Sequence, residues 1–96
     1  MITGNTIEAL RAAEAFTDDR RKLLVLGHPH ALDRLQREGA NFWREVPSCF
    51  RPNSATAQRI VGSFNGVPCA ADRQLAADRL LIMLGERQLA AVKWEV

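Results

Sequence analysis

The sequence predicts an α+β fold in which two helices pack on a small mixed sheet that is mostly antiparallel. The apolar run at residues 23–26 is bounded by Gly27 and Pro29, which is typical of a strand buried on both faces and followed by a helix. Asn65-Gly66 lies between two apolar runs and predicts a two-residue hairpin turn. Apolar residues recur at helical spacing before and after the first strand.

The first helix is expected to begin at Asn5 and to end near residues 18–21. Asn5 followed by Glu8 is typical of a helix N-cap and its back-reaching acid. The residues that recur at helical spacing are Ile7, Leu10, Ala13 and Phe16.

The second helix is expected over residues 30–46, with Pro47 ending it. Its apolar face would consist of Leu32, Leu35, Phe42, Trp43 and Val46. Gly39 lies near this face and costs about 1 kcal/mol against Ala in a helix. Either the helix breaks at Gly39, or the backbone packs tightly there on a neighbour. Residues 47–57, PSCFRPNSATA, then form a predicted loop.

The Asn-Gly turn also predicts a register for residues 59–71. Phe64 pairs with Val67, and Ser63 pairs with Pro68. The nitrogen of Pro68 then points away from its partner strand. We therefore expect residues 67–70 at a sheet edge or at a bulge.

Residues 80–84 form a second continuous apolar run, and we expect this strand and residues 23–27 to be inner strands. Residues 72–79 are either one helical turn or a loop. After a turn at 85–88, apolar and polar residues alternate as far as Val96, which predicts a strand with one solvated face. A competing interpretation makes residues 74–92 one long helix interrupted at Gly85.

Composition narrows the classes of protein and partner. The 96 residues suffice for a single domain, taken as 1–96. The net charge of +2 is too small to favour nucleic acid or an anionic membrane, and no apolar run approaches the ~20 residues of a membrane span. The N-terminus has no basic region followed by an apolar stretch, so we expect no secretory signal. Cys49 and Cys69 make no disulfide framework, which favours a cytoplasmic protein with reduced thiols.

The corner Gly27-His28-Pro29-His30 is the strongest candidate for chemistry. With Cys49, Cys69 or Asp33 nearby, two imidazoles could bind zinc, but their spacing matches no metal framework. A helix N-terminus attracts anions, yet neither a P-loop nor a GxGxxG pattern is present. The plain alternative is that the histidines cap the second helix or face water. We expect no metal and no cofactor.

Nucleophilic catalysis would need Ser48 or Cys49 beside His28 or His30 as base. In a chain with two histidines and two cysteines such a set can always be drawn. The plain alternative is that Cys49 is a small apolar side chain and that Cys69 is packed on a strand. No motif places a nucleophile, a base and an orienting group at recognised spacing, so we predict a protein that is not an enzyme.

Binding is the function that the sequence favours. Trp and Arg dominate interface hot spots, although interleaved acids such as Asp33 and Glu38 favour a solvated, self-paired helix face. The candidate binding residues are His28, His30, Arg34, Arg37, Trp43 and Trp94. Apolar stripes on both helices and the last strand exceed what one thin core needs, so we expect a protein partner or a second copy of the chain. Strand edges near Pro68 or Trp94 could add to another sheet. The alternative is a small enzyme, or a metal- or anion-binding protein, that uses the corner at residues 27–30.

Residues 62–84, GSFNGVPCAADRQLAADRLLIML, resemble a stretch of short phage-encoded proteins. In those proteins a G-x-F-x-G-(I/V)-P-V hairpin precedes an acidic loop and an apolar strand. The preceding LLVLG…ALDRL is similar to their strand-helix unit, whereas Cys69 replaces the usual aliphatic residue after Pro68. The resemblance implies a phage or prophage origin and an accessory role. It names no activity and assigns no functional residue.

Overall fold

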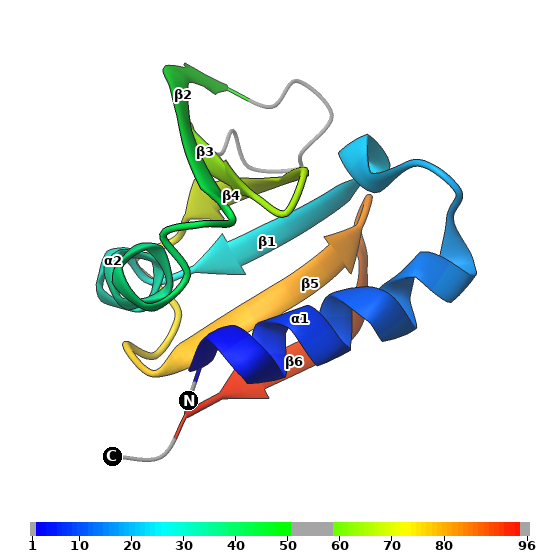
Figure 1. Cartoon of the computed structure of the whole chain (residues 1–96), viewed down its shortest axis with the longest axis horizontal. Helices are drawn as coiled ribbons and strands as arrows, with labels where there is room; N and C mark the ends of the chain where they lie inside the picture. Colours follow the sequence, from blue (N-terminus) through cyan, green and yellow to red (C-terminus); the bar gives the residue numbers. More distant parts are fainter. Residues whose placement is uncertain (1, 51–58, 95–96) are drawn as a thin grey trace.

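The computed structural model describes residues 2–50 and 59–94, with side chains described for 2–45 and 60–94. It confirms the α+β prediction, with two α-helices on a six-stranded mixed sheet of order β2-β3-β4-β1-β5-β6 (Figure 1). The helices are α1 (Ile2–Ala13) and α2 (Pro29–Glu38), and the strands are β1 (Leu23–Gly27), β2 (Trp43–Phe50), β3 (Arg59–Phe64), β4 (Val67–Ala71), β5 (Arg79–Leu84) and β6 (Arg87–Lys93). β1 pairs in parallel with β4, and the other four pairings are antiparallel.

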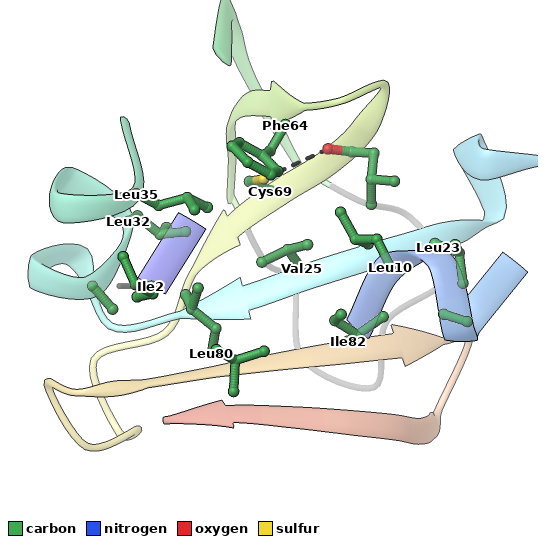
Figure 2. Close-up of a cluster of buried hydrophobic side chains, with 14 of the residues drawn as sticks. Ile2, Leu10, Leu23, Val25, Leu32, Leu35, Phe64, Cys69, Leu80 and Ile82 are labelled. Atoms are coloured by element: carbon green, nitrogen blue, oxygen red, sulfur yellow. Dashed lines mark hydrogen bonds between the residues drawn. The ribbon is translucent and has the colours of Figure 1, made fainter. Parts of the chain in front are cut away.

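β1 and β5 are inner strands, as predicted, and every residue of β1 is buried. Leu23 and Val25 point into the main core, which lies between the sheet and the two helices. Leu24 and Leu26 point to the opposite face of the sheet and pack there with Ile60. Figure 1 shows α1 along β5 and β6, with α2 seen end-on beside the carboxyl end of β1. Figure 2 shows the labelled side chains of the main core, which come from α1, α2 and the strands β1, β3, β4 and β5.

The β3–β4 hairpin has the predicted register, with Phe64 opposite Val67 and Ser63 opposite Pro68. Asn65 (φ 51°) and Gly66 (φ 84°) both adopt the positive φ that a type I′ turn requires. The prediction of an edge was wrong, because β4 lies between β3 and β1. β1 pairs only from Cys69 onward, so Pro68 precedes that ladder and its missing N–H costs no ladder bond. The β3–β4 pairing does have one irregularity, but it lies between Ile60 and Gly62 of β3, opposite Cys69 and Ala70, and not at Pro68.

The second helix is shorter than predicted, because α2 ends at Glu38. Gly39 is its C-cap and donates its N–H to the Leu35 carbonyl oxygen at 2.9 Å. A Cβ at Gly39 would lie 2.6 Å from Cε2 of Phe64. Both expected alternatives therefore hold at once: the helix ends at Gly39, and the backbone there packs tightly on a neighbour.

Residues 43–50 form β2, so the helix predicted over 39–46 and the loop predicted over 47–50 were wrong. Two N–H donations to the Gly39 carbonyl oxygen, from Phe42 (2.9 Å) and Trp43 (3.1 Å), turn the chain into the strand. Pro47 lies inside this edge strand, where the pairing with β3 is irregular, so its missing donor is tolerated. Residues 51–57 of the predicted loop lie outside the described residues.

α1 begins at Ile2, so Asn5 lies within the helix and does not cap it. The cap comes from a residue distant in sequence, since Oε1 of Glu38 accepts the Thr3 N–H at 3.3 Å. The helix ends at Ala13, and two 3₁₀ turns, Glu14–Phe16 and Arg20–Lys22, replace the rest of the predicted helix.

The C-terminal region forms the predicted strand pair, and the interpretation of residues 74–92 as one helix was wrong. Residues 72–78 form a loop, and a two-residue turn at Gly85-Glu86 joins β5 to β6, with Leu84 opposite Arg87. The predicted alternation as far as Val96 extends beyond the described residues. Within the described part of the chain, neither helix has the length and apolar character needed to cross a membrane.

Candidate functional site

A cleft of about 210 Å³ lies between α2 and the strands β2, β3 and β4. It is lined by Pro29, Leu32, Asp33, Gln36, Trp43, Glu45, Val61 and Ala71, and we call it the Trp43 cleft. The α2 residues are spaced by three and four, so they share one helix face. An outer extension of about 430 Å³ shares Asp33, Gln36, Trp43 and Glu45 with it and is also lined by Arg37 and Ala40.

Trp43 is half-buried and belongs to the wall of both the cleft and its extension. Its indole lies against Gly62 on the neighbouring strand, where a Cβ would come within 2.3 Å of Cζ2 and 2.8 Å of Cε2. Glycine is therefore the residue that leaves room for the ring. The indole Nε1 is buried and finds no acceptor among the described residues.

The polar rim of the cleft consists of Asp33, Gln36 and Glu45. Asp33 pairs with Arg37 one helical turn away. Gln36 Nε2 donates to Oε1 of Glu45 at 3.3 Å, and no cation of the described chain lies within ion-pair distance of Glu45. The inner cleft therefore combines apolar walls with two carboxylates.

The His-Pro-His corner lies beside this cleft, at the carboxyl ends of the parallel strands β1 and β4. Asp72 donates its N–H to the Gly27 carbonyl oxygen at 2.8 Å, which ties the two strand ends together. His28 is the N-cap of α2, because its Nδ1 accepts the His30 N–H at 3.0 Å. The plain alternative of a capping histidine is confirmed for His28. His30 is exposed.

Pro29 of this corner lines the cleft, but the residues lining it include neither histidine. Among the side chains described for residues 2–45 and 60–94, no three His, Cys, Asp or Glu residues gather as a metal site. That no metal binds stays a prediction.

Arg34, Glu38 and Trp94 lie together away from the cleft. The Arg34 guanidinium is 5.0 Å from the centre of the Trp94 ring, and its Nε donates to Oε2 of Glu38. Trp94 is only 5% exposed and belongs to the core. Desolvation opposes ionisation of Glu38, but hydrogen bonds from Arg34 and from the Thr3 and Ile2 backbone outweigh it and hold the pKa of Glu38 below its ordinary value. This group of side chains joins α1, α2 and the end of β6.

Cys69 is buried on β4, and its Sγ donates to the Val67 carbonyl oxygen at 3.5 Å (Figure 2). Burial raises the pKa of this thiol to about 12. A thiol of that kind is a poor nucleophile near neutral pH. The expectation that Cys69 is packed on a strand is confirmed, whereas the side chains of Ser48 and Cys49 lie outside the described part.

The six predicted binding residues therefore separate in space. Trp43 lines the cleft and Arg37 lines its extension, whereas Arg34 and Trp94 form a structural contact elsewhere. Comparison with protein-family models, with curated proteins and with solved structures finds no match to this chain.

Of the residues that line the cleft, the predicted binding set contained only Trp43. Pro29 and Asp33 were considered only as part of the His-Pro-His corner, and the other lining residues were missed: Leu32, Gln36, Glu45, Val61 and Ala71. One signal was present, because an isolated glycine in a strand, here Gly62, marks a close approach of another group. The meaning of this signal was missed because the predicted helix over residues 30–46 placed Trp43 on the same helix as Gln36, and not on a strand beside Gly62.

Proposed function

We propose that this protein is a binding domain without enzymatic activity that accepts a short segment of a protein partner in the Trp43 cleft. The observation that carries the proposal is a half-buried tryptophan in the wall of an apolar cleft with a polar rim. Protein interfaces have this composition, with aromatic anchors in desolvated pockets and polar groups around them.

Two of the groups that an enzyme could use at the corner already have structural roles. Nδ1 of His28 accepts the His30 N–H, and Cys69 is buried and held protonated. These contacts favour binding over the alternative of a small enzyme, or a metal- or anion-binding protein, at residues 27–30.

The resemblance to short phage-encoded proteins supports a proposal about the biological origin of this protein. We place the protein among accessory proteins of phages or mobile elements, acting in the cytoplasm. The β3–β4 hairpin followed by a loop and β5 is the order of elements that the resemblance implies. The free thiol of Cys69 accords with a reducing compartment.

Self-association is a second candidate, because β6 is an edge strand. Its residues 88–92 carry no formal charge, and edge strands of this kind can pair with another chain. Ala91 is exposed on β6. If copies pair through this edge, Ala91→Lys should reduce the molar mass measured by light scattering while the far-UV circular dichroism stays unchanged.

The principal test places a photo-cross-linking amino acid, benzoylphenylalanine, at Gln36 in cells that naturally make the protein. We expect a discrete cross-linked product that disappears when Trp43→Ala is added. The control carries the same group at Phe16, which is 54% exposed and lies outside the cleft. Mass spectrometry identifies the product as another protein or a second copy. Absence of a product at position 36, or the same products from position 16, would contradict the proposal.

A further inference from the structure

We infer that the segment bound in the Trp43 cleft inserts an arginine or lysine side chain, with its alkyl stem on the apolar walls and its cation at Asp33 and Glu45. This inference rests on the proposed function and specifies the chemistry of its ligand.

The walls suit the stem of a long basic side chain. Leu32 from α2 and Val61 from β3 line the cleft together with Trp43. Lysine and arginine bury their methylene groups along such surfaces while the charged end stays at the polar rim. In this cleft the polar rim is next to the apolar walls, because Asp33 of the rim is adjacent to Leu32 of the wall in α2 and both line the cleft.

The charges of the inner cleft select a cation. The whole chain has a net charge of +2, yet both charged residues that line the inner cleft, Asp33 and Glu45, are acidic. Arg37 pairs with Asp33 and thereby offsets one carboxylate. Glu45 accepts a hydrogen bond from the neutral Gln36 side chain, so its charge is not compensated by a cation in the described chain.

Elsewhere on α2, the protein already binds a guanidinium between an indole and a carboxylate. There, Arg34 lies over the ring of Trp94 and bonds to Glu38, so one guanidinium serves both an indole and a carboxylate. The cleft likewise combines an indole, that of Trp43, with a carboxylate, that of Glu45, in one lining. Stacking on an indole stabilises a cation in addition to the ion pair.

The test compares two blocked tripeptides, acetyl-Leu-Arg-Leu-amide and acetyl-Leu-citrulline-Leu-amide, which differ in the charge of the central side chain. Titration into ¹⁵N-labelled protein follows the two indole Nε1–H signals, which the Trp43→Phe variant assigns. We expect the arginine peptide to shift the Trp43 signal and to bind about fivefold more tightly than the citrulline peptide, as one solvated ion pair allows. The advantage should shrink as salt is added.

Glu45→Gln should remove most of that fivefold preference. The matched control, Glu86→Gln, changes an exposed carboxylate in the β5–β6 turn and should preserve it. Equal binding of the two peptides would overturn this inference and leave the proposed function standing. No shift of the Trp43 signal with either peptide would also overturn it, whereas the proposed function is decided separately by cross-linking from Gln36.

Discussion

At the scale of single residues, Gly62 governs the position of the candidate binding residue. A Cβ at this position would meet Trp43 at 2.3 Å and the Arg44 carbonyl oxygen at 2.9 Å. Neither the packed ring nor the backbone can move away without loss of packing. Gly62→Ala should therefore lower the free energy of unfolding by about 1–3 kcal/mol, as overpacking does. Urea unfolding followed by tryptophan fluorescence measures the change.

Gly4→Ala is the matched control for this substitution. Gly4 lies in α1 and has nothing within 4 Å of the added Cβ. Alanine there should leave the stability unchanged or raise it by up to ~1 kcal/mol, because alanine favours helix over glycine. A Gly62→Ala protein as stable as the parent would show that Trp43 does not lie against β3.

His28 has a structural role at the start of α2. His28→Ala should cost about 1 kcal/mol of stability, since the Nδ1 acceptor for the His30 N–H is lost. His28→Asn should recover much of this loss, because asparagine is a good N-cap. His30→Ala should have little effect because that side chain is exposed. Thermal unfolding of the three variants tests the assignment, and equal losses for His28→Ala and His30→Ala would refute it.

At the scale of elements, Glu38 couples the N-terminus of α1 to α2. Its folded-state pKa lies below the ordinary 4.5 expected in the unfolded chain. Stability from this carboxylate is therefore fully present above pH 4.5 and is lost as the pH falls through the folded-state pKa. Glu38→Gln should lower the stability at pH 7 and weaken its decline below pH 4.5.

Urea unfolding at several pH values between 7 and 3 measures this dependence. Glu86→Gln, in the exposed β5–β6 turn, is the control, because the carboxylate it removes makes none of the contacts described for Glu38. A Glu38→Gln protein that keeps the full acid dependence of the parent would contradict the coupling of α1 to α2.

The elements that local chemistry determines were predicted correctly. Asn65-Gly66 dictates a type I′ turn and with it the β3–β4 register, and the apolar run before Gly27 gave an inner strand. The prediction of helix over residues 39–46 was wrong, because the spacing of apolar residues there fits a helix as well as a turn and a strand. In the folded chain α2 ends at Gly39, where the backbone packs against Phe64, a residue distant in sequence. The interior position of β4 depends likewise on its long-range pairing with β1.

The candidate site was predictable only in part. Trp43 was expected as a binding anchor from its type alone, and it lines the cleft. The polar residues beside this tryptophan could not be predicted, because Gln36 and Glu45 meet only once the chain has turned at Gly39 between α2 and β2. His28 shows the converse: its residue type pointed to chemistry, but its ring nitrogen caps a helix.

At the scale of the whole molecule, the fold places the two tryptophans in different surroundings. Both helices lie on one face of the sheet and contribute to the main core there (Figure 1). Trp94, which directly follows β6, is buried in this core. Trp43 on the opposite edge strand remains half-buried beside the cleft. Substitutions at Trp94 should therefore impair folding, whereas substitutions at Trp43 should impair partner binding.

The affinity of the partner identified by cross-linking tests this central claim most directly. Calorimetric titration should show that Trp43→Ala raises the Kd by about 30-fold, the ~2 kcal/mol typical of a hot-spot tryptophan. Phe16→Ala, which removes an exposed aromatic side chain outside the cleft, should leave the Kd within about twofold. Unchanged affinity in Trp43→Ala, or an equal loss in Phe16→Ala, would contradict the assignment of the Trp43 cleft as the binding site.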